Sequence, residues 1–310
     1  MPSVPRRLIT QQSQAAISSA YNEAGYRYGK YADGNARDLF AFEGRHAYGD
    51  RKTWDAIEKR IGLLRASGER RLRVLDMGCG PGTWLRRVVV RAKQIGFVEV
   101  EARGVDIAEI QLHRARALSR RIAELDGVRL TFGYGDLREN IAVPEATWDL
   151  CLCLCGVLNH MPVQELAEIF TRIRNITAHY FVASLRAVGS TPTVYVDDVN
   201  AAVRFHQDNR INRLDVEFAN GRRSSFASHL FSSAELKRLV EPGLQVEDLC
   251  GLDLFHGRFA SDWRWNPPSG TMTPRLAQAL DRLEARFCRD PGFIDHATHL
   301  LIAARKVARS

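Results

Sequence analysis

The stretch Arg71–Thr83, which reads RLRVLDMGCGPGT, decides the fold of this chain. Its first half has the pattern of a strand, and glycines at 78, 80 and 82 follow directly. Behind them, apolar residues recur at helical spacing up to Ile95, while arginines take the other side. Glycines allow a tight turn from strand to helix, and the helix start exposes backbone N–H groups to a ligand. The stretch therefore predicts the first strand–turn–helix unit of a ligand-binding α/β fold.

Strand and helix patterns continue to alternate after this unit. Apolar, β-rich runs are followed by runs with the periodicity of an amphipathic helix, which is typical of a parallel sheet with helices on both faces. The run Thr147–Cys155 is nearly continuous in apolar residues and suits a central strand. The predicted strands are 71–76, 98–106, 128–136, 147–155, 178–185, 244–255 and 296–305, and later helices are predicted at 163–175, 232–241 and 274–287.

Two segments fall outside this rhythm. Residues 187–228 carry Asn220-Gly221 between two β-rich runs, a strong hairpin signal, and we predict that they form an inserted cap over the carboxyl edge of the sheet. Residues 1–60 carry five of the eight tyrosines and have a helical pattern. We therefore predict an N-terminal helical lid at 1–60 and an α/β domain at 61–310.

The composition is that of an ordinary globular protein. The chain has 310 residues, 45% of them hydrophobic and 26% charged, which excludes disorder and a miniature disulfide scaffold. Apolar runs stay far below the roughly 18 residues of a membrane helix, and the first residues lack a signal-peptide core. We expect a cytoplasmic protein without a membrane partner. The net charge of +8 comes from arginines interspersed with acidic residues, so nucleic-acid binding is not favoured. The six cysteines show no zinc spacing, and we expect no metal.

Carboxylates flank the glycine turn. Asp76 stands directly before the glycines, and Asp106 ends the next predicted strand, where a carboxylate can accept hydrogen bonds from both hydroxyls of a ribose. A dinucleotide dehydrogenase is the obvious competitor, but Thr83 stands where its third glycine belongs. Asp76 would also repel a pyrophosphate, and it suits a ligand with an ammonium group better. The turn therefore disfavours a dehydrogenase.

Four features follow one another in the sequence. These are VLDMGCGPG at 74–82, Val105-Asp106, Gly135-Asp136 and the apolar fourth strand. In the order of these features, the sequence resembles the class I S-adenosylmethionine (SAM) dependent methyltransferases. The resemblance covers residues 70–185 and, more loosely, 229–306. It implies an α/β, doubly wound, mostly parallel, seven-stranded Rossmann-like sheet with a reversed last hairpin. It also implies SAM as cofactor, with Asp76, Gly78 and Gly80 at the methionyl part, Asp106 at the ribose, Asp136 and Leu137 at the adenine, and Cys155 in the wall of the site.

Aromatic and imidazole side chains are expected around the reactive sulfonium of SAM. A tyrosine face can hold such a cation, and we predict that Tyr21, Tyr28 and Tyr31 of the lid contact the cofactor. His160 follows the fourth strand, where family members that act on small molecules often carry a histidine, and it is our candidate general base. The neighbouring Asn159 is placed to orient a substrate or the amino acid part of SAM.

The substrate class leaves several alternatives open. We predict methylation of a small molecule on O, N or C, in specialised metabolism, because the inserted cap would enclose a pocket. An RNA or protein methyltransferase is one alternative, although CGVLNHMP follows the fourth strand where adenine-modifying enzymes carry an Asn/Asp-Pro-Pro-aromatic motif. Another is attack on the homoalanyl carbon of SAM, an intramolecular cyclisation that releases 5′-methylthioadenosine. A non-catalytic binding protein is the last.

Overall fold

The computed structural model describes residues 17–19, 21–22, 38–42, 47–139, 148–190, 202–218, 221–256 and 273–307. The stretch that decides the fold forms strand β1 (Arg71–Met77), a glycine turn and helix α3 (Thr83–Gln94), as predicted. β1 is buried along most of its length because helices cover both faces of the sheet. The amphipathic pattern of α3 orients the helix, since Leu85, Val88 and Val89 are buried in the core.

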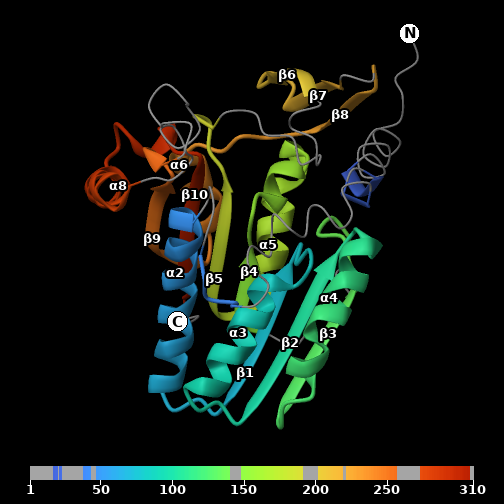
Figure 1. The fold of residues 1–310 in the computed structure, drawn as a ribbon, viewed down its shortest axis with the longest axis vertical. Helices are drawn as coiled ribbons and strands as arrows, with labels where there is room; N and C mark the ends of the chain where they lie inside the picture. Colours follow the sequence, from blue (N-terminus) through green and yellow to red (C-terminus); the bar gives the residue numbers. More distant parts are fainter. Residues whose placement is uncertain are drawn as a thin grey trace.

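The central sheet has seven strands among the described residues, in the order β3-β2-β1-β4-β5-β10-β9 (Figure 1). β10 runs antiparallel to β5 and β9, and the other neighbouring strands are parallel, which confirms the predicted sheet and its reversed last hairpin. The strand order reverses between β1 and β4, and ligands of such sheets bind beyond the carboxyl ends of the strands at this point. The other strands are β2 (Glu99–Asp106), β3 (Val128–Tyr134), β4 (Trp148–Cys153), β5 (Thr177–Arg186), β9 (Leu244–Leu252) and β10 (His299–Lys306).

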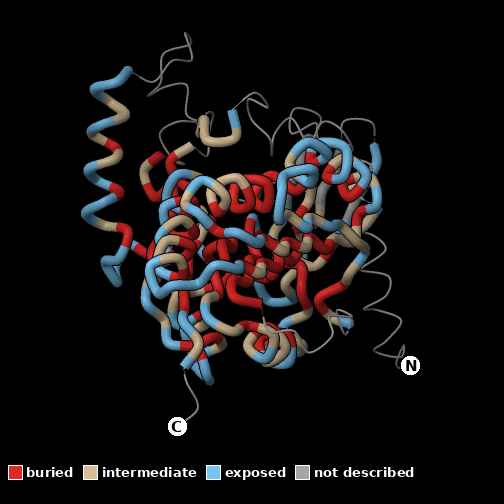
Figure 2. Tube along the Cα trace, turned by 90° about the horizontal axis from the view of Figure 1, so that it is seen from below, coloured by how far each residue is buried: buried red, intermediate tan, exposed pale blue. Residues whose placement is uncertain are grey.

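Helical layers cover the two faces of the sheet. One hydrophobic cluster joins one face to α2 and α3, and a second joins the opposite face to α5 and α6. Figure 2 shows the buried residues concentrated in the middle of the molecule, with exposed turns around them. Within the described ranges, no helix is long and apolar enough to cross a membrane. The other helices are α2 (Ala47–Ala66), α4 (Glu109–Ala123), α5 (Leu166–Ile176), α6 (Ser233–Val240) and α8 (Pro274–Phe287).

Helix α2 corrects the predicted domain boundary at residue 60, because it runs across that position without a break. Its buried residues Trp54, Ile57, Ile61 and Leu64 recur at helical spacing and pack into the same core as α3. The last part of the predicted lid is thus a helix that covers the sheet, and only residues before α2 remain as a candidate lid.

The predicted inserted cap contains a separate three-stranded sheet. β6 (Ala202–Asp208), β7 (Arg213–Phe218) and β8 (Arg223–Ala227) pair antiparallel in that order, so β7 and β8 are the arms of the predicted hairpin. The chain leaves the central sheet after β5 and returns beside it, where the Val188 N–H donates to the Phe231 carbonyl at 3.0 Å. The small sheet lies above the carboxyl ends of the central strands (Figure 1).

Candidate functional site

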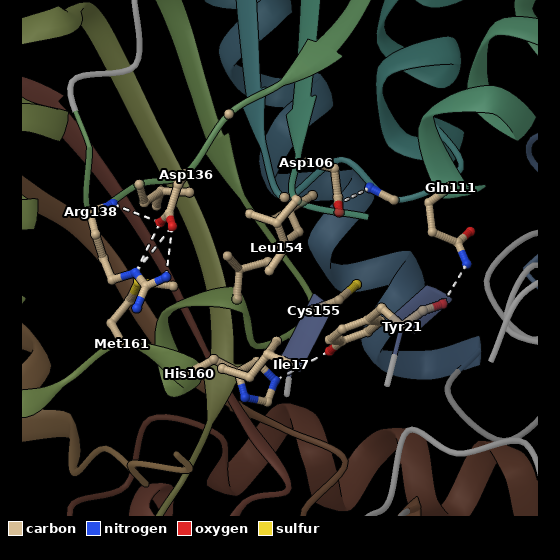
Figure 3. Close-up of a pocket in the computed structure, with 16 residues that line it drawn as sticks. Ile17, Tyr21, Asp106, Gln111, Asp136, Arg138, Leu154, Cys155, His160 and Met161 are labelled. Atoms are coloured by element: carbon tan, nitrogen blue, oxygen red, sulfur yellow. Dashed lines mark hydrogen bonds and ion pairs between the residues drawn. The ribbon is translucent and has the colours of Figure 1, made fainter. Parts of the chain in front are cut away.

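A cavity of about 70 Å³ lies at the carboxyl edge of the central sheet (Figure 3). Most of the predicted site residues line it, whereas Asp76 and Asn159 do not, and Tyr28 and Tyr31 lie outside the described residues. The structure therefore brings together residues that are far apart in the sequence. The lining residues are Ile17, Tyr21, Gly78, Gly80, Asp106, Ile107, Gln111, Gly135, Asp136, Leu137, Arg138, Leu154, Cys155, Val157, His160 and Met161.

The glycine turn after β1 is closely packed against its neighbours. Gly78 and Gly80 have left-handed backbones, with φ of 76° and 51°. A Cβ atom on Gly78 would lie 2.3 Å from Cγ2 of Val157, in the turn after β4. The Gly80 N–H donates to Oδ2 of Asp106 at 2.8 Å. Only glycine combines this backbone with this approach at position 78, so the turn holds a fixed shape at the cavity wall.

Asp106 is held at the end of β2 by two backbone donors. Its Oδ2 accepts from Gly80, and its Oδ1 accepts from the Ala108 N–H at 2.9 Å. Burial raises the pKa of Asp106, and these backbone N–H groups act in the opposite direction. A carboxylate offers about four acceptor positions, so an oriented Asp106 can receive ligand hydroxyls as well.

Asp76 is a buried carboxyl next to this wall. Its exposed fraction is 1%, and within the described part of the chain its Oδ2 has no hydrogen-bond partner. Burial, with the nearby negative charge of Asp106, raises the pKa of Asp76 to about 7. A buried carboxylate without a donor is costly, and a cationic ligand group nearby would relieve that cost. The orphaned oxygen therefore fits an ammonium group better than a phosphate.

The loop after β3 carries an ion pair that the sequence analysis did not anticipate. The Arg138 N–H donates to Oδ1 of Asp136 at 2.9 Å, and Nη2 of Arg138 donates to Oδ2 at 2.7 Å. Nε of Arg138 contacts both carboxylate oxygens, at 3.1 and 3.2 Å. Asp136 is only 3% exposed, so its charge is paired where it is buried. The predicted adenine site at Asp136 and Leu137 is thus bordered by a guanidinium.

Residues 17–19 and 21–22, here called the leader, lie against the start of α4. Oγ of Ser18 donates to the Ile107 carbonyl at 3.1 Å, and Oδ1 of Asn22 accepts from the Ile110 N–H at 3.2 Å. These bonds tie the leader to the loop that follows Asp106. No signal in the sequence pointed to them, because they join residues that are 88 or more positions apart.

His160 lines the cavity and contacts both the leader and the inserted cap. Its Nδ1 lies 3.0 Å from the Ala227 carbonyl of β8, and its Nε2 lies 3.2 Å from the Tyr21 hydroxyl. A carbonyl only accepts, so Nδ1 carries the proton and Nε2 accepts from Tyr21. Burial lowers the pKa of His160 to about 4, and the positive charge of Arg186 adds to this, while the Ala227 carbonyl acts against it. The imidazole is therefore neutral at neutral pH.

The other two predicted residues of the turn after β4 play different parts. Cys155 lines the cavity and has a left-handed backbone with φ of 58°. Asn159 is 1% exposed, and its amide is used by the fold. It donates to the carbonyls of Arg186 and His229 at 3.1 and 2.5 Å and accepts from the Arg186 N–H at 2.8 Å. The catalytic role expected for Asn159 is thus not supported, because its side chain joins the turn to β5 and the returning chain.

Some lining residues were missed by sequence reasoning. Arg138 follows Asp136 by two positions, a spacing that allows such an ion pair and could have been recognised. Gln111 in the first turn of α4 donates to the Tyr21 carbonyl at 3.4 Å, which the helical pattern alone does not reveal. Within the described residues, no group of three or more His, Cys, Asp or Glu side chains is arranged to hold a metal ion.

Known proteins resemble this chain over its central region. Residues 74–179 match a family model described as a methyltransferase domain. A protein of Aspergillus luteorubrus described as "Probable methyltransferase ltbC" is 29% identical over 110 residues, which is 33% of this chain and 35% of that protein. The match therefore spans about a third of the length of this curated relative.

Solved structures extend the likeness to the whole fold. Magnesium protoporphyrin IX methyltransferase from Synechocystis, solved with bound SAM, has a TM-score of 0.51 and 14% identity and covers 95% of this chain and 97% of its own. A SAM-dependent methyltransferase from Clostridium acetobutylicum has a TM-score of 0.51 and 12% identity, with coverage of 91% and 99%. At these identities the likeness shows the fold.

The sheet order and the cavity define a Rossmann-like α/β fold with a cavity at the carboxyl ends of β1, β2 and β3. The family model matches the strands and turns that build this site. Residues 74–179 thus match a methyltransferase domain, and the chain as a whole shares its fold with solved SAM-dependent methyltransferases.

Proposed function

We propose that this chain is a SAM-dependent methyltransferase that modifies a small molecule, in specialised metabolism, in the cavity beside His160. The observation that carries the proposal is the row of carboxylates on adjacent strands. Asp76 lies in β1, Asp106 ends β2 and Asp136 follows β3, and the glycine turn is bonded to Asp106. Acidic groups at three neighbouring strand ends suit a ligand with one cation and several hydroxyl and amine donors.

The residues present fit SAM part by part. The orphaned Oδ2 of Asp76 suits the ammonium group, Asp106 suits the ribose hydroxyls, and Asp136 with the backbone of Leu137 suits the adenine edge. Gly78 and Gly80 present backbone at the cavity wall without side chains. When bound, SAM supplies an electrophilic methyl group on its sulfonium.

His160 and Tyr21 are proposed to act at the acceptor. The neutral imidazole presents Nε2 as a hydrogen-bond acceptor, and the O–H or N–H of a substrate can take the place of the Tyr21 hydroxyl there. Its lowered pKa makes His160 a weak base, so it suits acceptors that lose their proton as the new bond forms. The leader, with Tyr21, is proposed to be part of a lid that excludes water.

Identification of the product that SAM leaves behind tests this proposed function. The protein is incubated with SAM, alone and with candidate phenols and amines, and the products are identified by mass spectrometry. S-adenosylhomocysteine (SAH) that forms only with an acceptor supports methyl transfer. 5′-Methylthioadenosine formed from SAM and protein alone, above a protein-free control, would contradict it and indicate cyclisation. RNA binding whose affinity falls with salt concentration steeply enough to indicate contacts with several phosphates would contradict a small-molecule substrate.

A matched pair of variants links the activity to the site. Asp106→Ala should weaken SAH binding by about 1–3 kcal/mol, because ribose hydroxyls lose their acceptor. Asp126→Ala removes an exposed carboxylate from the turn between α4 and β3, at the opposite edge of the sheet, and should bind SAH like the wild type. Isothermal titration calorimetry measures both, and a failure of the wild type to bind SAH would overturn the assignment of the cofactor.

A further inference from the structure

The guanidinium of Arg138 forms an ion pair with the Asp136 carboxylate in the cavity wall. Both groups line the cavity, and their side chains are 12% and 2% exposed. Nη2 and Nε of Arg138 form a fork around the carboxylate, and the Arg138 N–H adds a third donor to Oδ1 (Figure 3). Rotation about the last bond of an aspartate is otherwise soft, with broad and roughly two-fold preferences. The fork therefore fixes the plane of a carboxylate that would rotate without it.

The backbone beneath this fork is also fixed. Nη1 of Arg172 in α5 donates to the carbonyls of Leu137 and Arg138, and the Glu139 N–H donates to the Asp136 carbonyl at 3.1 Å. The loop after β3 is thus held from the side of α5, while its side chains face the cavity. The ion pair is not a loose surface contact, since the backbone that carries both partners is anchored.

We propose that Arg138 is a positioning residue for the purine of the cofactor: it orients Asp136 so that the carboxylate meets the 6-amino group. The inference rests on the proposed function, because it takes the nucleoside of SAM as the ligand. A carboxylate that is already oriented binds an amine without a further loss of rotational freedom. Arg138 thus acts through Asp136, and its influence is confined to ligands that carry the amino group.

A cycle of ligand and protein changes isolates this role. SAH and its analogue with hydrogen in place of the 6-amino group are titrated into the wild type and Arg138→Met by calorimetry. We expect Arg138→Met to weaken SAH binding about tenfold and to change the binding of the analogue less than twofold. Arg129→Met, at a position whose side chain is 78% exposed, is the matched control and should bind both ligands like the wild type.

Each other result contradicts the inference in its own way. An equal loss for both ligands means that Arg138 only supports the loop, and tighter SAH binding means that Arg138 competes with the ligand for Asp136. If Arg138→Met does not fold by circular dichroism, Arg138→Lys takes its place, since it keeps the charge but loses the fork, and the same difference between the ligands is required. A wild type that binds neither ligand overturns the proposed function itself, an outcome distinct from those above.

Discussion

The hydroxyl of Tyr21 lies 3.2 Å from Nε2 of His160, although the two residues are 139 positions apart. This bond connects the leader, which is tied to the loop after β2, with the turn after β4. The two rings meet edge to face, with centroids 5.9 Å apart. The leader therefore extends along the cavity from the loop after Asp106, on the proposed ribose side, to His160, on the proposed acceptor side. The Tyr21 hydroxyl makes the contact with His160.

Removal of the Tyr21 hydroxyl should weaken the attachment of the leader, the proposed lid, to His160. In Tyr21→Phe the ring remains, but Nε2 of His160 loses its donor, and we expect SAH to bind about two- to tenfold more weakly because the closed leader is less populated. Calorimetry measures the effect. Tyr180→Phe changes a tyrosine in β5, away from the cavity, and should have no effect. Unchanged binding in Tyr21→Phe would mean that the leader does not contribute to cofactor affinity.

His160 should make the protein less stable in acid. Its pKa is about 4 in the folded protein, below the ordinary value of 6.5, so between these values the unfolded chain binds the extra proton. The free energy of unfolding therefore falls as the pH decreases from about 6.5 to about 4, and this residue should account for a loss of about 2 kcal/mol between pH 7 and pH 5. Urea denaturation at both pH values measures it.

Replacement of His160 by asparagine isolates the contribution of the imidazole to the pH dependence of stability. His160→Asn keeps a donor for the Ala227 carbonyl and removes the titrating ring. The free energy of unfolding of this variant should therefore fall by about 2 kcal/mol less than that of the wild type between pH 7 and pH 5. His179→Asn replaces an exposed histidine and should retain the wild-type pH dependence. If His160→Asn keeps the full dependence, the buried imidazole is not its source.

Asp76 should make cofactor binding depend on pH near neutrality. Its pKa is about 7, and only the ionised carboxylate attracts an ammonium group, so SAH affinity should rise about tenfold from pH 6 to pH 8. Asp76→Asn should bind more weakly and with little dependence on pH. Calorimetry of both proteins over this range tests the prediction, and an equal pH dependence in the variant would refute the proposed contact.

Local patterns in the sequence were sufficient to predict the sheet and several of the residues that line the cavity. The run at 71–83, the apolar stretch before Cys155 and the hairpin signal at Asn220-Gly221 each depend on neighbouring residues, and the predicted strands were found. Asp106 and Asp136 could be located because the ends of parallel strands meet at one edge.

The features of the fold and the cavity that could not be predicted from the sequence depend on contacts between residues far apart in the chain. Nothing near Tyr21 in the sequence indicates that it reaches His160, and the boundary at residue 60 was misplaced because α2 is amphipathic like a lid helix but packs on the sheet. The role of Asn159 was hidden for the same reason, since its partners lie 27 and 70 positions away. Periodicity shows that a helix has an apolar face, and it does not show which surface covers that face.

Asn159 should be a residue of stability rather than of catalysis. In Asn159→Asp, an oxygen replaces the amide nitrogen that now donates to two buried carbonyls, of Arg186 and His229, and the repulsion should lower the free energy of unfolding by about 3 kcal/mol. Asn175→Asp, at an exposed position of α5, is the control and should change stability by less than about 0.5 kcal/mol. Urea denaturation measures stability, and turnover is compared per folded molecule at saturating SAM. A variant that is as stable as the wild type but loses its turnover would return Asn159 to the list of catalytic residues.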